Sequence, residues 1–595
     1  MHPYRTHTCN EINESEVGQQ ARISGWIHRV RDHGGVVFID LRDHYGITQV
    51  VVDPERDFYE DVHHWRLEST VCFTGEIVRR EEETVNATLA TGKVELMADE
   101  MKVLNRAETL PFPVADEPDY PEATRLRYRF LDLRRGQLHE NIVLRSKITN
   151  SIRQRMIGLD FNEVQTPILT ASSPEGARDF LVPSRLHPHK FYALPQAPQI
   201  FKQLLMVAGF DKYFQIAPCF RDEDSRADRS PGEFYQLDLE MSFCTQDDVF
   251  EVVETVMSGL FDEFAVDGSK ISTLPFVRIP YRQAMLDFGC DKPDLRNPLR
   301  IIDVTEVFED TEFKAFTSVV KKGGVVRAMK VTGIVDQSRK FFDDMIEFAQ
   351  SVGSKGLGYI GWKAEEVRSP IAKFLNREQL EALKTAADIE SGDVLFFIAD
   401  KEKAACEIGA AVRNELGARL ELLEPNAYRF CWIVDYPMFE RDEATGKVEF
   451  SHNPFSMPQG EMEALETKDP LDVLAYQYDL VCNGIELSSG AIRNHKPEIM
   501  YKAFEIAGYD SSVVDNKFPG LITAFTLGAP PHGGIAPGLD RIVMLLTNQP
   551  NIREIIAFPM NQSAQDLMMN APSEINERQL RELHIQLRPM KGKKQ

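Results

Sequence analysis

The chain has 595 residues, 43% of them hydrophobic, which exceeds the length of one domain and predicts roughly two to four domains with sizeable cores. A formal net charge of −24 argues against a nucleic-acid partner unless the basic residues are grouped. The sequence contains neither an apolar run of about eighteen residues nor an apolar N-terminal segment, so we expect no membrane span, no membrane partner and no secretory signal.

The basic residues are in fact grouped. Between Arg125 and Arg155 there are nine Arg and Lys residues and two acids. A local basic track can hold RNA on an acidic protein, with a marked dependence on salt. None of the eight cysteines forms a CxxC pair, so we expect no zinc site and no disulfide framework, and a cytoplasmic location.

Residues 1–110 are predicted to form a small β domain. Five short strands with one helical spacer are typical of an OB-type barrel, whose sheet face binds oligonucleotides by stacking and by polar contacts. Phe38 could stack on a base, although a lone aromatic in a strand more often belongs to the core. The predicted strands are 21–30, 35–43, 46–53, 70–80 and 93–106, and the spacer is 57–67.

Residues 111–140 are predicted to be a hinge, because four prolines interrupt regular structure before a basic segment. A plain proline-rich linker is the alternative. A helix is then predicted over 141–158 and a strand over 161–169. Pro167 would place that strand at an edge or a bulge.

A charged hairpin is predicted around the stretch 220–240, FRDEDSRADRSPGEFYQLDLE. Polar and apolar residues largely alternate over 233–240, and 211–221 is also strand-like. The loop between them carries Arg221, Arg226 and Arg229, which could reach a polyphosphate and an RNA end together. A solvated hairpin whose charges pair with each other is the alternative.

Just upstream, 172–185 is predicted to be a loop that could act as a mobile lid, and 196–202 places two amides and Lys202 near a helix start. Such groups suit a zwitterion, although a capped helix with surface amides fits equally. Residues 285–420 are interpreted as an α/β insertion, because strands and helices alternate there and few side chains suggest catalysis. The predicted strands are 324–331, 356–362 and 392–399, and the helices are 338–352, 377–387 and 401–417.

Beyond the insertion, the strand-like segments 476–481 and 484–487 frame Asp479 and Glu486. Near a triphosphate such an acid pair would hold Mg²⁺, whereas the alternative is an ion-paired sheet surface. The small residues of 533–538 would let backbone approach a ligand, and Arg541 follows in the first turn of a helix, where an anion is favoured. The motif is neither a Walker A loop nor a Rossmann fingerprint.

Five segments together carry a resemblance: RFLDLRR (129–135), SPEGARDFLVPSR (173–185), QAPQIFKQLL (196–205), FRDEDSRADR (220–229) and APPHGGIAPGLDR (529–541). They resemble the class II aminoacyl-tRNA synthetases, and most closely the bacterial aspartyl-tRNA synthetases. The resemblance implies an α+β multidomain homodimer with an N-terminal OB-fold barrel and an antiparallel catalytic sheet. The implied domains are 1–110 for anticodon binding, 111–140 as hinge, 141–284 and 421–560 for catalysis, 285–420 as insertion and 561–595 as C-terminal extension.

The resemblance also assigns the ATP site. Arg221 would grip the α-phosphate and Arg541 the γ-phosphate, and these two arginines would be the catalytic pair. Phe234 would stack on adenine, while Asp479 and Glu486 would hold Mg²⁺. The remaining implied ATP contacts are Asp222, Glu223, Gly538, Leu539 and Asp540.

The amino-acid pocket and the RNA contacts are implied in the same way. Arg493 and Lys202 would bind the side-chain carboxylate of L-aspartate, with Asp238 orienting them. The α-ammonium would face Glu175 and Gln199, and His452 would complete the pocket. The implied anticodon contacts are Arg31, Phe38, Gln49 and Glu95.

Two positions bear on tRNA choice. His33 stands where family members restricted to tRNA(Asp) tend to have Leu, and it resembles relaxed enzymes that also charge tRNA(Asn). Glu83 stands where restricted members tend to have Lys and fits neither pattern. We expect charging of both tRNAs. The alternatives are a tRNA(Asp)-only ligase, a lysine or asparagine ligase of the same group, and a non-catalytic OB-fold RNA-binding protein.

Overall fold

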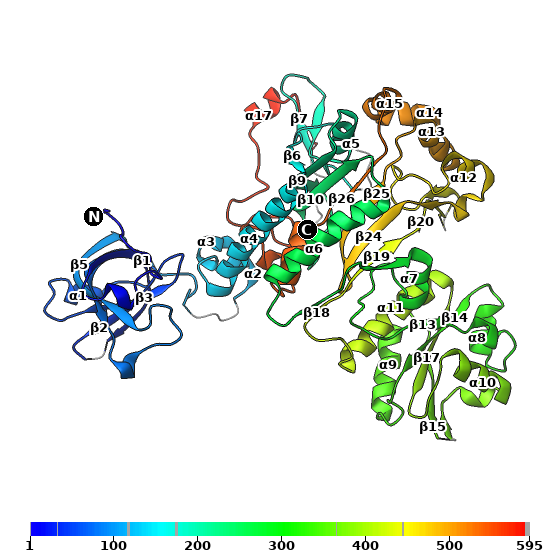
Figure 1. Ribbon diagram of the computed structural model, residues 1–595, viewed down its shortest axis with the longest axis horizontal. Coiled ribbons are helices and arrows are strands. Elements are labelled where there is room, and N and C mark those ends of the chain that lie inside the picture. The colour runs from blue at the N-terminus through cyan, green and yellow to red at the C-terminus, as the bar shows by residue number, and fades with distance from the viewer. Residues whose placement is uncertain are drawn as a thin grey trace. The chain divides into compact units, whose positions relative to one another are not determined.

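A computed structural model represents the protein, and it describes residues 2–32, 34–115, 120–172, 177–364, 366–442 and 445–588. The chain forms two compact units, Met1–Ile142 with Ala557–Ser573 and Val143–Ile556 with Glu574–Gln595 (Figure 1). Within the described ranges every helix is too short or too polar to cross a lipid bilayer.

The first unit contains a closed five-stranded barrel with the order β1-β2-β3-β5-β4 (Figure 1). β3 and β5 pair in parallel and the other neighbours are antiparallel. The predicted OB-fold barrel is confirmed, but its helical spacer shrinks to one turn. The elements are β1 (Gln20–Asp32), β2 (Val37–Arg42), β3 (Ile47–Val52), α1 (Tyr59–Val62), β4 (Thr70–Arg79) and β5 (Val94–Asn105).

Side chains of the barrel alternate between its core and its outer face, as the period of a strand requires. Ile39, Leu41 and Val50 are fully buried in the core. Phe38 is the neighbour of Ile39 in sequence but is only half-buried and does not belong to that core. The interpretation of Phe38 as a core residue is therefore wrong.

An eight-stranded sheet organises the second unit, with the order β12-β19-β24-β25-β26-β10-β9-β6. The two outermost pairs, β12 with β19 and β6 with β9, are parallel, and the remaining neighbours are antiparallel. The strands are β6 (Asn162–Glu163), β9 (Lys212–Arg221), β10 (Gly232–Ser242), β12 (Val277–Pro280), β19 (Phe430–Val434), β24 (Gln477–Cys482), β25 (Ile485–Ile492) and β26 (His532–Ile535).

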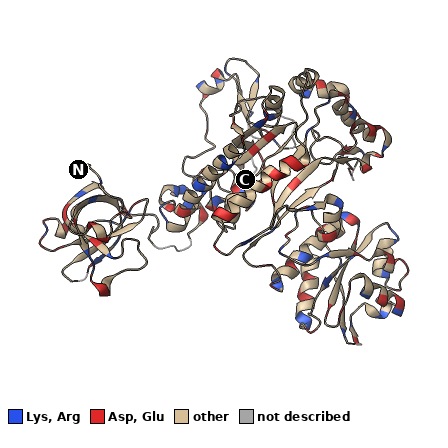
Figure 2. Ribbon diagram, in the orientation of Figure 1, with Lys and Arg blue, Asp and Glu red and all other residues tan. Residues whose placement is uncertain are grey.

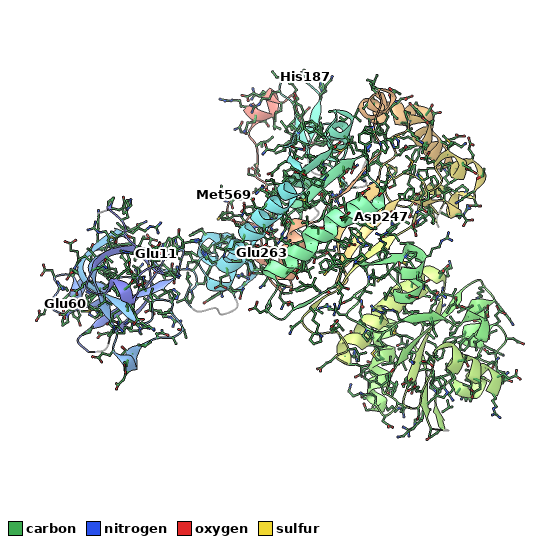
Figure 3. The ribbon with its side chains drawn as sticks, in the orientation of Figure 1. Glu11, Glu60, His187, Asp247, Glu263 and Met569 are labelled. Carbon is green, nitrogen blue, oxygen red and sulfur yellow. The ribbon has the colours of Figure 1, made fainter. Side chains whose placement is uncertain are left out.

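Three helices pack on this sheet through one apolar core: α4 (Gly136–Gly158), α6 (Gln246–Phe264) and α16 (Leu539–Leu546). A capping box formed by Thr245 and Asp248 fixes the start of α6. Asp247 and Glu263 are labelled near the two ends of α6 in Figure 3. Figure 2 shows acidic residues along α6 and basic residues along α4. Arg155 of α4 meets Glu263 at 2.9 Å, so part of the basic track binds protein carboxylates.

β26 runs between β25 and β10, which explains its glycines. A Cβ at Gly534 would lie 2.1 Å from the Leu239 carbonyl oxygen and 2.2 Å from a carboxylate oxygen of Glu240. A Cβ at Gly533 would lie 2.5 Å from Ile492. These two glycines therefore make room for neighbouring strands and for a buried carboxylate, not for a ligand as the sequence suggested.

The inserted segment forms a separate antiparallel sheet with the order β13-β14-β17-β15-β16. The three central strands and three of the helices were predicted, whereas the short edge strands were not. The elements are α7 (Tyr281–Phe288), β13 (Ile301–Asp303), α8 (Lys314–Val320), β14 (Val325–Val331), α9 (Arg339–Ser351), β15 (Gly358–Lys363), β16 (Glu366–Arg368), α10 (Arg377–Ala386), β17 (Val394–Asp400) and α11 (Glu402–Arg419).

Several predicted elements differ in length. The strand expected over 161–169 is reduced to β6, because Thr166 donates its backbone N–H to the side chain of Gln215 and Pro167 has none to give. The predicted C-terminal extension contains one short helix among its described residues, α17 (Glu577–Glu582). The remaining elements are α2 (Glu122–Arg127), α3 (Arg129–Asp132), β7 (Leu181–Pro183), β8 (Phe191–Ala193), α5 (Gln199–Val207), β11 (Lys270–Ile271), β18 (Ala427–Tyr428), β20 (Tyr436–Pro437), β21 (Phe439–Arg441), β22 (Val448–Phe450), α12 (Glu461–Thr467), β23 (Leu474–Ala475), α13 (Pro497–Ile506), α14 (Ser511–Lys517) and α15 (Pro519–Thr526).

Candidate active site

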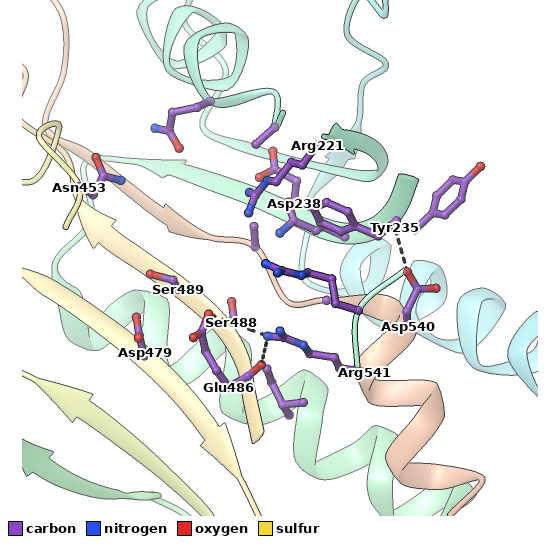
Figure 4. A pocket seen from close by; sticks show the side chains of 18 of the residues that line it. Arg221, Tyr235, Asp238, Asn453, Asp479, Glu486, Ser488, Ser489, Asp540 and Arg541 are labelled. Carbon is purple, nitrogen blue, oxygen red and sulfur yellow. Dashed lines mark hydrogen bonds and ion pairs between the residues drawn. The ribbon is translucent and has the colours of Figure 1, made fainter. Parts of the chain in front are cut away.

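A cavity of about 560 Å³ opens in the second unit. Its lining comes from β9, β10, β24 and β25 of the eight-stranded sheet and from the beginnings of α5 and α16. Figure 4 shows arginines and carboxylates from these elements gathered around one space. The residues singled out in the sequence that line it are Gln199, Lys202, Arg221, Glu223, Arg226, Arg229, Phe234, Asp238, His452, Asp479, Glu486, Arg493, Gly538, Asp540 and Arg541.

Two buried cations occupy one end of the cavity. Lys202 of α5 donates to Asp238 at 2.6 Å and lies 3.3 Å from Glu240. Arg493, just after β25, contacts both carboxylate oxygens of Glu240 at 2.9 and 3.2 Å. Lys202 is 1% exposed and Arg493 2%, so both charges are removed from water and matched by carboxylates.

Sequence reasoning missed Glu240. It follows Asp238 by two residues on β10, so both side chains stand on the same face of the strand, and this spacing was the available signal. Although burial favours the neutral acid, Arg493 and Lys202 lower the pKa of Glu240. Burial raises the pKa of Asp238, against the opposing charge of Lys202.

Two arginines mark the other end. Arg221, the last residue of β9, lies over the ring of Phe234 with its guanidinium carbon 5.0 Å from the ring centroid. Arg541 is the third residue of α16 and donates to the Glu486 carbonyl at 2.6 Å and to the Asp228 carboxylate at 3.2 Å. Both guanidinium groups reach the same space (Figure 4), which makes this end suited to a polyphosphate.

Asp479 and Glu486 lie close together on β24 and β25, beside Arg541 (Figure 4). Burial and the neighbouring charge of Glu486 raise the pKa of Asp479 to about 7. One oxygen of Asp479 accepts from the Tyr436 hydroxyl at 2.8 Å, while the other is buried and accepts no hydrogen bond from the described residues. An orphaned carboxylate oxygen beside a second carboxylate fits a divalent cation.

The described residues contain no cluster of three or more metal-ligating side chains. Magnesium does not need one, because it is commonly held by one or two carboxylates together with substrate phosphates and water. The residues present therefore fit Mg²⁺ bound jointly with a nucleotide.

Some residues singled out in the sequence lie elsewhere. Leu539 is 2% exposed and belongs to the apolar core. Asp222 pairs with Arg178 and is absent from the cavity lining. Asp540 reaches the cavity, but its carboxylate accepts from the Tyr235 backbone at 3.0 Å and meets Arg145 of α4 at 2.5 Å.

Four further positions were predicted to take part in the pocket or in tRNA choice. His452 lines the cavity with its ring centroid 5.0 Å from that of Tyr436. Glu83 is an exposed residue of a short turn in the first unit. Glu175 and His33 lie outside the described residues.

The predicted anticodon residues form a connected group on the barrel. Arg31 donates to Asp40 at 2.7 Å and to Gln49 at 3.1 Å, and Gln49 donates to Glu95 at 2.8 Å. Phe38 is the direct cross-strand partner of Arg31. An aromatic ring beside fixed polar groups can stack on a base and read its edge.

Lys292 and Asp228 also line the cavity and were passed over. Lys292 lies within the stretch interpreted as an insertion, where no local pattern marks it. Its ammonium group lies 3.3 Å from the Glu486 carboxylate.

The chain matches two family models. Residues 121–562 match "tRNA synthetases class II (D, K and N)", and residues 21–104 match "OB-fold nucleic acid binding domain". It is 61% identical over 587 residues to the Aspartate--tRNA(Asp/Asn) ligase of Zymomonas mobilis, covering 99% of this chain and 98% of that protein. The protein of the same name from Gluconobacter oxydans is 58% identical over 587 residues, with the same coverage.

Solved structures share the fold. An asparaginyl-tRNA synthetase from Pyrococcus horikoshii superposes with a TM-score of 0.57 at 17% identity, covering 93% of this chain and 97% of that one. An aspartyl tRNA synthetase from Entamoeba histolytica gives 0.56 at 19% identity, with 93% and 90% covered.

Proposed function

Since this chain belongs to the class II tRNA synthetases of the D, K and N group, we propose that it is an aspartate–tRNA ligase that charges both tRNA(Asp) and tRNA(Asn). The names of its relatives, 61% and 58% identical over nearly the whole chain, support both tRNAs. The observation that carries the amino-acid specificity is the pair of buried cations, Lys202 and Arg493, at one end of the cavity.

These two cations suit a substrate with an acidic side chain. The side-chain carboxylate of L-aspartate would bind between Lys202 and Arg493, which Asp238 and Glu240 already hold in place. The uncharged amide of asparagine would lose the charge-assisted hydrogen bonds that Lys202 and Arg493 donate to a carboxylate, so asparagine is expected to bind more weakly. Gln199 would face the α-ammonium together with Glu175, and His452 would close the pocket.

Adenylate formation needs no dedicated base. An oxygen of the α-carboxylate of L-aspartate forms a bond to the α-phosphorus of ATP. The bond from this phosphorus to the bridging oxygen breaks, and diphosphate leaves with its electron pair. Arg221 would hold the α-phosphate, Arg541 the γ-phosphate and Phe234 the adenine ring. Fixed cations aimed at the developing charge lower the barrier by orientation and electrostatics.

Asp479 and Glu486 would hold Mg²⁺, which when bound neutralises charge on the phosphate oxygens. The ribose hydroxyl at the tRNA 3′ end then attacks the mixed anhydride, and AMP leaves. Arg31, Phe38, Gln49 and Glu95 would contact the anticodon. The proposal includes a cytoplasmic homodimer, with the catalytic fold split into 141–284 and 421–560 by the insertion at 285–420.

The first test is ATP–diphosphate exchange in the presence of each amino acid. Exchange that depends on L-aspartate and not on L-asparagine or L-lysine is expected, and dependence on either of the others would refute the assignment. Arg493→Leu is expected to abolish the aspartate dependence, while Arg368→Leu, which removes an exposed arginine of the inserted sheet, leaves it unchanged.

The second test concerns the tRNA. Purified transcripts of tRNA(Asp) and tRNA(Asn) are both expected to accept aspartate. If only tRNA(Asp) is charged, the enzyme is restricted to one tRNA and the relaxed assignment fails.

A further inference from the structure

A short connecting strap, residues 290–297, lies between α7 and the first strand of the inserted sheet. It rests against the turn that joins β24 to β25, since a Cβ at Gly484 of that turn would lie 3.3 Å from the Cβ of Asp294. The same turn leads into Glu486. The strap therefore meets the catalytic sheet next to its acid pair.

A buried arginine of the inserted domain holds the strap. Arg413 of α11 is 1% exposed and donates to three backbone carbonyls, those of Asp294, Asn297 and Leu299, at 2.9, 2.7 and 2.8 Å. The side-chain amide of Asn297 donates a hydrogen bond to the Arg413 carbonyl at 2.9 Å. This network fixes the strap to the body of the insertion.

Lys292 projects from the strap into the cavity. Its ammonium lies 2.8 Å from Asp291 and 3.3 Å from one oxygen of Glu486, whose other oxygen lies 4.0 Å from Arg541. An ammonium has three donors, and the described residues give it two carboxylate partners, so one N–H is left for a ligand. Although burial opposes it, the carboxylates of Glu486 and Asp291 raise the pKa of Lys292.

We infer that Lys292 is a further catalytic residue, which contacts the diphosphate end of ATP and neutralises the charge on diphosphate as it leaves. This inference rests on the proposed function. It also gives the inserted domain a part in the reaction, because the domain delivers a further cation to a site where Arg221 and Arg541 come from the catalytic sheet and α16.

The test is aspartate-dependent ATP–diphosphate exchange with the full-length protein. Lys292→Gln is expected to raise the KM for diphosphate about tenfold or more, the loss typical of one charged hydrogen bond, and to change the KM for aspartate less than about twofold. Lys292→Arg keeps the charge and is expected to retain most of the diphosphate affinity. The matched control is Lys340→Gln on α9, which removes an exposed lysine of the same domain and is expected to change nothing.

A second readout does not depend on turnover. With Mn²⁺ alone as the probe, measured by electron paramagnetic resonance, Lys292→Gln is expected to tighten binding to the ligand-free protein several-fold, because the acid pair loses a neighbouring cation. Weaker diphosphate binding and tighter metal binding in the same variant would exclude a merely structural role.

The inference is overturned if Lys292→Gln leaves both the diphosphate KM and the Mn²⁺ affinity within about twofold, or if it raises the aspartate KM as much as the diphosphate KM. Failure of the proposed function looks different, because the unsubstituted protein would then show no aspartate-dependent exchange at all.

Discussion

Arg541 donates hydrogen bonds to two oxygens of the described residues, the Glu486 carbonyl at 2.6 Å and the Asp228 carboxylate at 3.2 Å. The carbonyl orients the guanidinium and can stay in place when a nucleotide binds. The Asp228 carboxylate lines the same cavity and accepts from one Nη of Arg541. A γ-phosphate bound to Arg541 as proposed would compete with this carboxylate for that donor.

Asp228→Asn is expected to tighten equilibrium ATP binding roughly twofold to fivefold, because a partly exposed ion pair of this kind contributes about 0.2–1 kcal/mol. Isothermal titration with ATP measures the change. Asp224→Asn, an exposed acid of the same loop, is the control and should leave the affinity unchanged. Weaker ATP binding by Asp228→Asn would show that this carboxylate assists the nucleotide.

His532 illustrates a second kind of residue, buried beneath the amino-acid end of the cavity and absent from its lining. Its Nδ1 donates to the Pro530 carbonyl at 2.8 Å, so its Nε2 accepts from the Gln203 amide at 3.0 Å. Burial is the main cause that lowers the pKa of His532 below its ordinary value of 6.5. The native protein therefore holds this imidazole neutral.

The neutral His532 makes the stability of the folded protein depend on pH. Below about pH 6.5 the unfolded chain takes up a proton on this residue that the native chain does not, so stability falls as the pH falls. His532→Gln is expected to reduce the loss of unfolding free energy between pH 7.5 and 5.5 by about 1 kcal/mol, measured from urea midpoints. Burial lowers the pKa of His495 as well, so some loss remains. His64→Gln, which replaces an exposed histidine, should keep the full loss, and the reverse ranking would contradict the assignment.

For single residues, the sequence predicted those that stand in a recognisable local pattern. The arginines of the hairpin loop and the residue after the glycine-rich motif stand in recognisable segments, and the cavity lining includes them. Lys292 and Asp228 had no such signal, because their partners are brought to them only by the path of the chain through the fold. The core alternative for Phe38 was wrong, because alternation along a strand does not say which of its two faces is inside.

At the scale of elements, α4 and α16 are joined by one buried ion pair. Arg145 of α4 meets Asp540 of α16 at 2.5 Å, and Asp540 is 3% exposed. The same carboxylate accepts from the Tyr235 backbone of β10. One side chain thus ties two helices and a strand together immediately behind Arg541.

Arg145→Met is expected to destabilise this unit by about 3–5 kcal/mol, because it leaves the Asp540 charge buried without a cationic partner. Thermal and urea unfolding measure the loss. Lys147→Met on the exposed side of the same helix is the control and should cost less than about 0.5 kcal/mol. Equal losses in the two variants would show that helix propensity, not the ion pair, sets the cost.

Elements with a clear alternation of polar and apolar residues were predictable from the sequence, as the long strand β10 shows, and its strand-like partner β9 was predicted as well. The strand predicted over 161–169 is reduced to the two-residue β6, and the edge strand β13 was not predicted, because the pairing of both depends on distant backbone rather than on their own composition. The glycines of β26 show the same limit. Gly534 must be small because the Glu240 carboxylate of the neighbouring strand lies against it, and the motif alone does not reveal that neighbour.

At the scale of the whole molecule, the barrel and the catalytic sheet belong to separate compact units. The proposed function assigns RNA recognition to the first unit and adenylate formation to the second. Changes on the barrel face should then leave the first chemical step intact.

Phe38→Ala is expected to lower kcat/KM for tRNA aspartylation about tenfold, the loss typical of one stacked base, while aspartate-dependent exchange stays within about twofold. Tyr45→Ala removes an exposed aromatic from the β2–β3 turn of the same barrel and serves as the control, with both activities retained. A parallel loss of exchange in Phe38→Ala would argue that the barrel face supports adenylate formation as well.

The chain leaves the catalytic sheet along β12 and re-enters it along β19, and these neighbours run parallel. Parallel neighbours cannot be joined by a tight turn, because the chain must first be carried back to the starting edge. A miniaturised enzyme made by deleting the inserted sheet therefore needs a return path, and α7, whose Ala284 and Phe288 already pack against β19, is the natural piece to keep. Splicing β12 directly to β19 would reverse a strand and unravel that edge of the molecule.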